Sequence, residues 1–421
     1  MLVTTSADNV VNIKVIGIGG GGCNAINTMI SDYDIPGVDF LAFNTDAQSL
    51  KQSLSPTTLQ LGEDLTKGLG VGGNHELGAQ AAEESLDQIQ EMIEGSNMVF
   101  ITAGMGGGTG TGAAPIIAGV AKNMGALTVA VVTKPFDFEG VQRKEVAEDG
   151  LTALRDKVDT LIVVPNQRLL EIVDDTVSFI DAMRMVDSVL AEGVSSISNL
   201  ISQTGYINAD FNDARSVMQN AGTALMGIGR ASGEGRAEKA ARLATASPLL
   251  DMSIEGATGI LYNIEGANLS LTEISMVSDL IKEAVDPSAN IKFGAQINEE
   301  LADEIIITIV ATGIHKTDSG LPSDSITKSE DKKVFSSTIE DGEITDMFSG
   351  FTTPNMDRKL KGDDKDKSKS KSEKLSGGLK FDISEDLDSD DSKEKKKKSS
   401  VAIDLDSKDP LDVPAFMRKK K

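Results

Sequence analysis

The feature that most limits what this chain can fold into is a dense glycine run, GMGGGTGTG, at residues 104–112. An apolar, β-branched segment (98–103) precedes the run and a helical pattern (113–124) follows it, so the run is expected to form a strand-to-helix turn. So many glycines make a turn costly in chain entropy. Such a turn is favoured where backbone must approach a ligand, and at a helix start that ligand is usually an anion.

A second glycine run, Gly17–Gly22, lies in the same setting after an apolar segment at 11–18. Alone it satisfies the GxGxxG dinucleotide pattern, with Asp46 as a possible ribose ligand. No GxxxxGK[ST] motif occurs, so a P-loop enzyme is excluded. Parallel strands end at one edge of a sheet, so both turns can reach one ligand. Two phosphate-binding turns fit a nucleoside triphosphate better than a dinucleotide.

The order of the predicted elements indicates an α/β fold. Strands that alternate with helices predict a Rossmann-like parallel sheet with helices on both faces. Apolar periodicity over 177–202 predicts a helix of about seven turns, long enough to cross a domain. A second, smaller α/β domain is expected from about residue 221. The expected elements are strands at 11–18, 38–43, 98–103, 127–132, 160–164, 259–264, 291–297 and 304–311, and helices at 113–124, 177–202, 237–246 and from Ser270.

Composition narrows the class of protein further. The net charge of −24 argues against binding to nucleic-acid backbones. One cysteine excludes a disulfide framework and a zinc site built from cysteines. The two histidines are isolated in the sequence, so a metal site built from histidines is not expected. No apolar run reaches membrane-spanning length and no secretory signal precedes the first strand. We therefore expect a reduced, cytoplasmic protein without transmembrane insertion.

The C-terminal quarter differs from the rest of the chain. Residues 316–421 carry 23 basic and 24 acidic side chains, so nearly all of the negative charge lies before them. The composition of 316–405 predicts a disordered linker. The last segment, 406–421, concentrates apolar residues beside a basic end and predicts a docking peptide. Its candidate contact residues are Leu411, Val413, Pro414, Phe416 and Met417.

Six motifs in one order are similar to those of a known family. They are VIGIGGGGCNA, FNTDAQSL, KGLGVGGN, GMGGGTGTG, TKPFDFEGVQR and NADFND. With them, residues 11–314 resemble FtsZ, the family of bacterial tubulin-like cell-division GTPases. The resemblance implies a flexible N-terminus (1–10), a GTP-binding domain (11–176), a central helix (177–203), a catalytic loop with the next helix (204–220), a C-terminal α/β domain (221–315), a linker (316–405) and a docking peptide (406–421).

The resemblance also implies a nucleotide site for GTP or GDP with Mg²⁺. Its metal would be held through the phosphates, with Asp46 as a possible further ligand. Guanine would be recognised by Asn166 and Asp187, because a carboxylate can accept from both guanine donors. The implied nucleotide-binding residues are Gly20, Gly21, Gly22, Cys23, Asn24, Asn44, Asp46, Gly70, Gly72, Gly73, Gly106, Gly107, Gly108, Thr109, Gly110, Glu139, Arg143, Asn166, Met183 and Asp187. Met183 stands where the family usually places an aromatic ring on the base.

Catalysis is implied for a different part of the chain. Asn208, Asp210 and Asp213 match the loop with which the family completes the nucleotide site of the next subunit, so assembly is head-to-tail. An alternative interpretation is that Asp210 and Asp213 only cap the following helix. The implied partners are further copies of the chain, together with membrane-tethering and division-regulating proteins bound by the C-terminal peptide. The implied location is the mid-cell division ring, on the inner face of the membrane.

Two other functions remain open from sequence. A dinucleotide-dependent oxidoreductase would use Gly17–Gly22, although it leaves GMGGGTGTG unexplained. A structural relative that binds nucleotide without hydrolysing it would assemble only, although Asp210 and Asp213 speak against it.

Overall fold

The computed structural model describes residues 11–33, 35–170, 177–202, 207, 209–247 and 253–314. The expectations for the N-terminal segment 1–10, for Asn208, for the linker 316–405 and for the docking peptide 406–421 lie outside these residues. No helix in the described chain is both long and apolar enough to cross a membrane.

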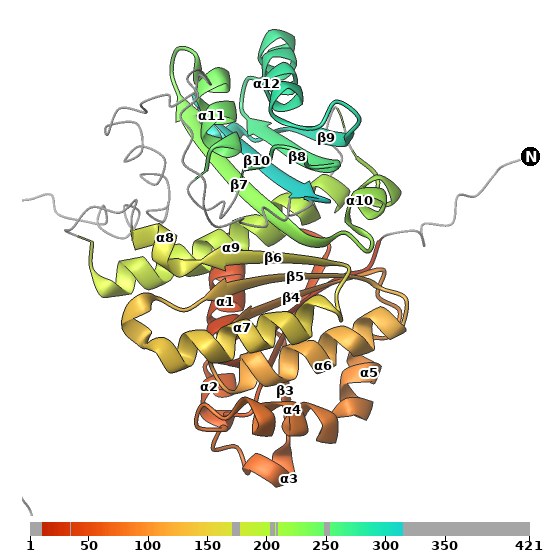
Figure 1. Ribbon diagram of the computed structural model, residues 1–421, viewed down its shortest axis with the longest axis vertical. Helices are drawn as coiled ribbons and strands as arrows, with labels where there is room; N and C mark the ends of the chain where they lie inside the picture. Colours follow the sequence, from red (N-terminus) through yellow and green to blue (C-terminus); the bar gives the residue numbers. More distant parts are fainter. Residues whose placement is uncertain are drawn as a thin grey trace, which may run out of the picture. The chain divides into compact units, whose positions relative to one another are not determined.

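The first half of the described chain is a parallel sheet with the strand order β3-β2-β1-β4-β5-β6. Figure 1 shows β4, β5 and β6 of this sheet side by side. Helices alternate with its strands, which confirms the predicted α/β class. The elements are β1 (Ile13–Ile18), α1 (Gly19–Asp32), β2 (Val38–Asn44), α2 (Ala47–Lys51), β3 (Thr57–Gln60), α3 (Glu63–Thr66), α4 (His75–Glu84), α5 (Leu86–Ile93), β4 (Met98–Gly104), α6 (Thr109–Asn123), β5 (Leu127–Lys134), η1 (Asp137–Glu139), α7 (Val141–Arg155), β6 (Thr160–Pro165) and α8 (Asn166–Leu170).

The central strands are apolar on both faces because helices cover both. In β1, Ile13 and Val15 belong to the core formed with α1 and α9 (Phe179–Ser202). Ile16 and Ile18 belong to a second core on the opposite face, formed with α4 to α7. All four side chains are fully buried. This explains the continuous apolar runs, which are typical of parallel sheets.

The second half extends the same sheet in the order β7-β10-β8-β9. The start of β7 pairs with β6 in parallel, and the rest of β7 pairs with β10 in antiparallel. One long strand therefore joins the two halves. The elements are α10 (Phe211–Met218), β7 (Gly222–Ser232), α11 (Arg236–Thr245), β8 (Gly259–Gly266), α12 (Leu271–Ala284), β9 (Asn290–Ile297), η2 (Glu299–Leu301) and β10 (Glu304–Thr312).

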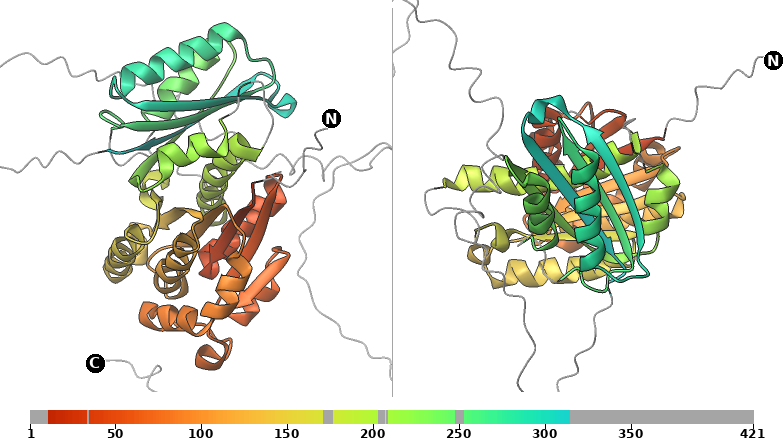
Figure 2. Two further views of the ribbon diagram at one scale, coloured as in Figure 1. Left: turned by 90° about the vertical axis from the view of Figure 1, so that its right-hand side faces the viewer. Right: turned by 90° about the horizontal axis from the view of Figure 1, so that it is seen from above.

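Helix α9 lies between the two halves and packs on both. Figure 2 shows the C-terminal strands between α9 on one side and α11 and α12 on the other. Along β10, Ile305 and Ile307 belong to the core with α11 and α12, whereas Ile306 and Val310 belong to the core that contains α9. The predicted long helix is confirmed, with its start at Phe179. Since α9 shares a core with β1, β4, β5 and β6 and also with β10, it joins the two halves through one continuous core.

Strand β7 was missed by the sequence patterns, as was the short β3. The sequence of β7, GTALMGIGRAS, contains three glycines, which usually weaken a strand. The structure gives a packing reason for two of them. A Cβ at Gly227 would lie 2.0 Å from the Ala244 carbonyl oxygen, and one at Gly229 would lie 2.0 Å from that of Ala240. Helix α11 thus lies directly on the backbone of β7.

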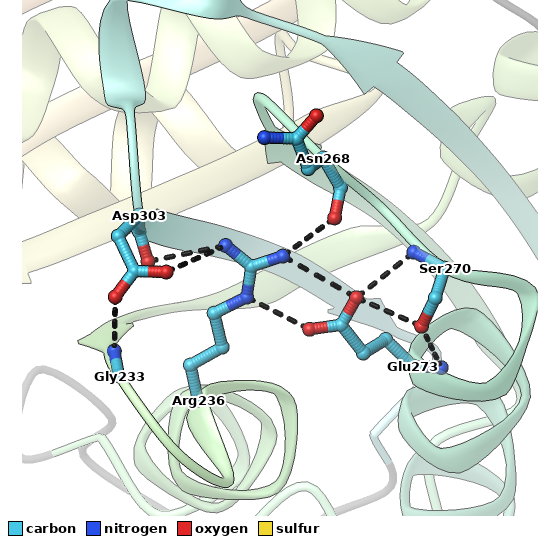
Figure 3. Close-up of polar contacts among 6 residues, drawn as sticks. All are labelled: Gly233, Arg236, Asn268, Ser270, Glu273 and Asp303. Atoms are coloured by element: carbon cyan, nitrogen blue, oxygen red, sulfur yellow. Dashed lines mark hydrogen bonds and ion pairs between the residues drawn. The ribbon is translucent and has the colours of Figure 1, made fainter.

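A buried arginine holds the C-terminal half together (Figure 3). Arg236, at the start of α11, is 7% exposed. Its Nε lies 2.7 Å from Glu273 Oε1, and its Nη2 and Nη1 donate to the carbonyl oxygens of Asn268 (2.6 Å) and Asp303 (3.1 Å). Glu273 also accepts from the backbone N–H of Ser270, which caps α12. One guanidinium therefore connects α11, α12 and the turn before β10.

This network predicts a pH-dependent loss of stability. Hydrogen bonds from Arg236 and Ser270 lower the pKa of Glu273 from 4.5 to about 2. Because the folded pKa lies below the unfolded one, the stabilisation is complete above about pH 4.5 and is lost as the pH falls towards 2. Glu273→Gln should lower the free energy of unfolding at pH 7 by roughly 1–3 kcal/mol.

Urea unfolding of both proteins between pH 7 and pH 3 tests this. The difference in free energy should narrow steadily below about pH 4.5, whereas Glu283→Gln, an exposed position on the same helix, should change little. A difference that stays constant with pH would contradict the assignment.

Candidate nucleotide site

A cavity of about 660 Å³ lies at the edge of the sheet where β1, β4, β5 and β6 end. Both glycine turns line it, the first through Gly20 and Gly21 and the second through Gly107 and Gly108. The start of α9 closes another side with Met183. Parallel strands therefore bring segments that are distant in sequence to one place, as the sequence predicts.

The glycines of the two turns serve two different purposes. Some pack backbone on backbone: a Cβ at Gly22 would lie 2.4 Å from the carbonyl oxygen of Thr102, and one at Gly110 would lie 2.9 Å from that of Gly104. Gly20 is different, because a Cβ there would meet no atom within 4 Å. At Gly107 the nearest atom would be 4.0 Å away. Packing does not explain these two glycines, whereas close approach of a ligand does.

The cavity offers hydrogen-bond donors to an anion. Helix α6 begins at Thr109, and the cavity lining includes Gly108, Thr109 and Gly110 at that N-terminus. Free backbone N–H groups and the helix dipole favour negative charge there. The hydroxyls of Thr45 and Thr109 hydrogen bond at 2.7 Å, which fixes the loop after β2 against the second glycine turn.

Two side chains in the cavity lining are hydrogen-bond acceptors. Asn166 is 6% exposed, and its Oδ1 has no hydrogen-bond partner within the described chain. Asp187, half-buried on α9, lines the same cavity, and burial raises the pKa of its carboxyl from 3.8 to about 7. Both groups would be stabilised by a ligand that donates hydrogen bonds.

Glu139 and Arg143 form an ion pair of 3.1 Å at the mouth of the cavity. Glu139 Oε1 also accepts from the backbone N–H of Phe136 at 2.9 Å, so its carboxylate is held in one position. A surface pair at this spacing would contribute little. Here the backbone of Phe136 fixes the carboxylate of Glu139, and both residues of the pair line the cavity, which supports a binding role.

The structure separates the predicted nucleotide-binding residues into two groups. Those that line the cavity are Gly20, Gly21, Asn24, Gly72, Gly73, Gly107, Gly108, Thr109, Gly110, Glu139, Arg143, Asn166, Met183 and Asp187. Those that lie behind or beside its lining are Gly22, Cys23, Asn44, Asp46, Gly70 and Gly106.

The second group supports the lining residues. Cys23 is buried, and burial raises the pKa of its thiol to about 12, so it packs as a neutral residue. Asn44 Oδ1 accepts from the backbone N–H of Asp46, which in turn caps α2. Gly106 has a positive φ, and a Cβ there would meet the carbonyl oxygen of Arg143 at 2.6 Å.

Sequence reasoning missed several lining residues, among them Thr133, Pro135, Phe138 and Phe179. Three of them lie in the motif TKPFDFEGVQR, so that motif could have been used to predict them as lining residues. Phe179 is four residues before Met183, and helical spacing could have placed it on the same face.

The predicted catalytic acids do not lie at this cavity. Asp210 and Asp213 form a capping box at the start of α10: the Asp213 N–H donates to Asp210 Oδ1 at 2.7 Å. Asp213 also lies 2.8 Å from Lys292 Nζ on the edge strand β9, and Lys292 lowers the pKa of the Asp213 carboxyl. Helices α8 and α10 lie at opposite ends of α9, which spans about 36 Å (Figure 1).

Comparison with known proteins agrees with this architecture. Residues 12–174 match the Tubulin/FtsZ family GTPase domain, and residues 222–315 match the FtsZ family C-terminal domain. A point mutant of FtsZ from M. jannaschii is 43% identical, with a TM-score of 0.70 over 72% of this chain and 92% of that chain. An empty FtsZ dimer from M. jannaschii is 42% identical, with a TM-score of 0.69 over 77% of this chain and 95% of that one.

A more distant structure shows the same fold. It is the GTPγS-bound protofilament of CetZ2 from Haloferax volcanii, which is 21% identical with a TM-score of 0.60 over 73% of this chain and 95% of that one. Fold and site together define a tubulin-type GTPase. The chain belongs to the FtsZ family, whose members form filaments for cell division. The oxidoreductase alternative is therefore wrong, since Gly17–Gly22 belongs to the GTPase domain.

Substitution of the open glycines should separate ligand binding from folding. Gly20→Ala and Gly107→Ala place a methyl group in space that no protein atom occupies, so thermal stability should change little. Nucleotide affinity should fall at least about tenfold, because the methyl group stands where backbone must approach phosphate. Gly119→Ala, on α6 away from the cavity lining and with only ordinary contacts, is the control. Unchanged affinity in both cavity variants, measured by calorimetry, would contradict the phosphate assignment.

The raised pKa of Asp187 predicts pH-dependent binding. Guanine donors would favour the ionised carboxylate, so the pKa falls when GTP binds. Affinity should then rise with pH through about 7, by roughly tenfold between pH 6 and pH 8. Asp187→Asn should flatten this dependence. Calorimetric titration in buffers of different ionisation enthalpy also measures the proton released, and no release at pH 6.5 would contradict the assignment.

Proposed function

We propose that the cavity binds GTP with Mg²⁺ and that its hydrolytic site is completed by Asp210 and Asp213 of the next subunit. The observation that carries the proposal is the separation of these acids from the cavity, at opposite ends of α9. One subunit cannot bring both to the same phosphate, whereas head-to-tail association of two subunits can. Such a contact does not close and therefore gives filaments.

Binding of the nucleotide follows from the lining of the cavity. The triphosphate lies against the turns after β1 and β4 and the N-terminus of α6, where amides replace the lysine of a P-loop. Glu139 and Arg143 contact the ribose. Asn166 and Asp187 accept from guanine, whose paired donors adenine lacks. Preference for GTP over ATP follows from that pair of acceptors.

The described residues fit a Mg²⁺ that is held mainly by phosphates. They contain no cluster of three or more potential protein ligands. Asp46 is a single carboxylate beside the cavity, and one of its oxygens already accepts from the Gln48 N–H at 2.9 Å. Mg²⁺ usually keeps waters and binds through one or two carboxylates plus phosphates. Its chemistry is to neutralise charge on the β- and γ-phosphates.

The acids are prepared for their role by their own subunit. The capping box fixes both carboxylates at the start of α10, and Lys292 keeps Asp213 ionised. An ionised carboxylate can accept a hydrogen bond from water and orient it towards the γ-phosphate. Helix capping and catalysis are compatible, because each carboxylate oxygen has two lone pairs. Asp213 uses Oδ2 in the cap and Oδ1 with Lys292, and each oxygen keeps a lone pair for water.

Filament location would be set by the C-terminal segment 406–421. Its apolar residues, such as Val413 and Phe416, favour docking to membrane-tethering and division-regulating proteins. The linker 316–405 would allow the filament to lie at a distance from that tether. These features support assembly at the mid-cell division ring on the inner face of the membrane.

The separation of the acids from the cavity predicts a variant that binds but does not turn over. Asp213→Asn keeps the shape of the side chain and should leave GTP affinity within about twofold. Hydrolysis should fall about 100-fold or more, because the charge that polarises water is removed. In the unmodified protein, turnover per subunit should rise with protein concentration. Asp286→Asn, a partly exposed acid that also accepts a backbone N–H, is the control. Loss of GTP affinity in Asp213→Asn would contradict the proposal.

A further inference from the structure

Two aromatic rings are exposed at the nucleotide cavity for which packing gives no reason. Phe138 is 64% exposed and Phe179 is 65% exposed, and both line the cavity. No other phenylalanine of the described chain is more than half exposed. Exposed aromatic surface is costly, and beside a cavity it indicates a surface that a ligand covers.

The two rings pack on each other and on a buried ring. Phe136 is 2% exposed and lies in the core. Phe138 stacks on it with ring centroids 5.0 Å apart and planes at 16°. Phe179 meets Phe138 edge to face, with centroids 6.4 Å apart and planes at 62°. A chain of three rings thus leads from the core to the mouth of the cavity, in geometries that aromatic pairs favour.

The position of Phe179 on α9 connects this chain of rings to the base. Phe179, Met183 and Asp187 are spaced four residues apart, so they lie on one face of the helix. Asp187 is the proposed guanine acceptor. Met183 is partly buried and has no ring, so it can cover a base but cannot stack on it. Phe179 is the next ring-bearing residue on that face.

We propose that Phe179, buttressed by Phe138, packs its ring on the purine base and supplies the aromatic contact that Met183 lacks. This rests on the proposed function, because the base is that of the GTP held in the cavity. Stacking involves the π-face that every base has, so Phe179 contributes affinity without selecting guanine. Asp187 contributes the selection. The two residues therefore have separable effects on binding.

Direct binding measurements test the separation. Phe179→Ala should weaken GTP, GDP and ATP alike by about tenfold, leaving the ratio of GTP to ATP affinity unchanged. Phe179→Tyr keeps a ring and should restore binding to within about twofold. Ile180→Ala is the matched control, since Ile180 is 64% exposed on the next position and does not line the cavity. All variants change exposed residues, so folding is retained, and thermal unfolding verifies this.

A spectroscopic measurement reports the contact itself. The chain has no tryptophan, so Phe179→Trp introduces its one indole. Its emission should change on addition of GTP, with the same Kd that calorimetry gives for that variant. Inorganic tripolyphosphate, which has no base, should leave the emission unchanged. Ile180→Trp should not respond to GTP.

Three results would overturn the proposal, each in a recognisable way. If GTP binds to the unmodified protein but Phe179→Ala keeps the same Kd, Phe179 does not contact the base and the proposed function still stands. If Phe179→Ala binds normally but assembles only at higher protein concentration, the rings contact another subunit instead. If the unmodified protein binds no nucleotide, the proposed function and this inference both fail.

Discussion

The close approach of backbone to ligand is the constraint on which the rest of the structure depends. In the proposed site, the turns after β1 and β4 bring amide groups to one anion without side chains between them, which Gly20 and Gly107 allow. Parallel pairing of β1 with β4 then sets the two turns side by side. Packing imposes its own demand on neighbouring positions, such as Gly22 against Thr102. Binding and folding therefore require glycine for different reasons within a few residues.

Helix α9 connects this edge of the sheet with the other half of the molecule. Its first turns line the cavity, and its last residues share a core with the C-terminal strands. Strand β7 makes a second connection, because it pairs with β6 and β10. Packed elements therefore connect the cavity with α10, where Asp210 and Asp213 lie. The same architecture keeps the acids away from the cavity of their own subunit.

Much of this could be predicted from sequence, where local patterns carry the information. The glycine turns, the long helix and the capping box of Ser270 are local features, and the structure has each of them. Strand β7 could not be predicted, because its glycines are required by close packing against Ala240 and Ala244 on helix α11. The exposure of Phe179 and the ion pair of Asp213 with Lys292 are likewise tertiary facts. Sequence spacing alone does not contain them.

The central claim is that a cavity and a pair of acids from different subunits form one hydrolytic site. Mixing two inactive variants tests it most directly. Asp213→Ala keeps an intact cavity, whereas Gly108→Ser keeps intact acids but directs its Cβ into Val71 and Gly73 at the cavity. Phosphate release from the equimolar mixture should exceed the sum of the two separate proteins, because some junctions join good acids to a good cavity. If Gly108→Ser is shown to enter filaments and the mixture still releases no more phosphate than that sum, the site lies within one subunit and the account is contradicted.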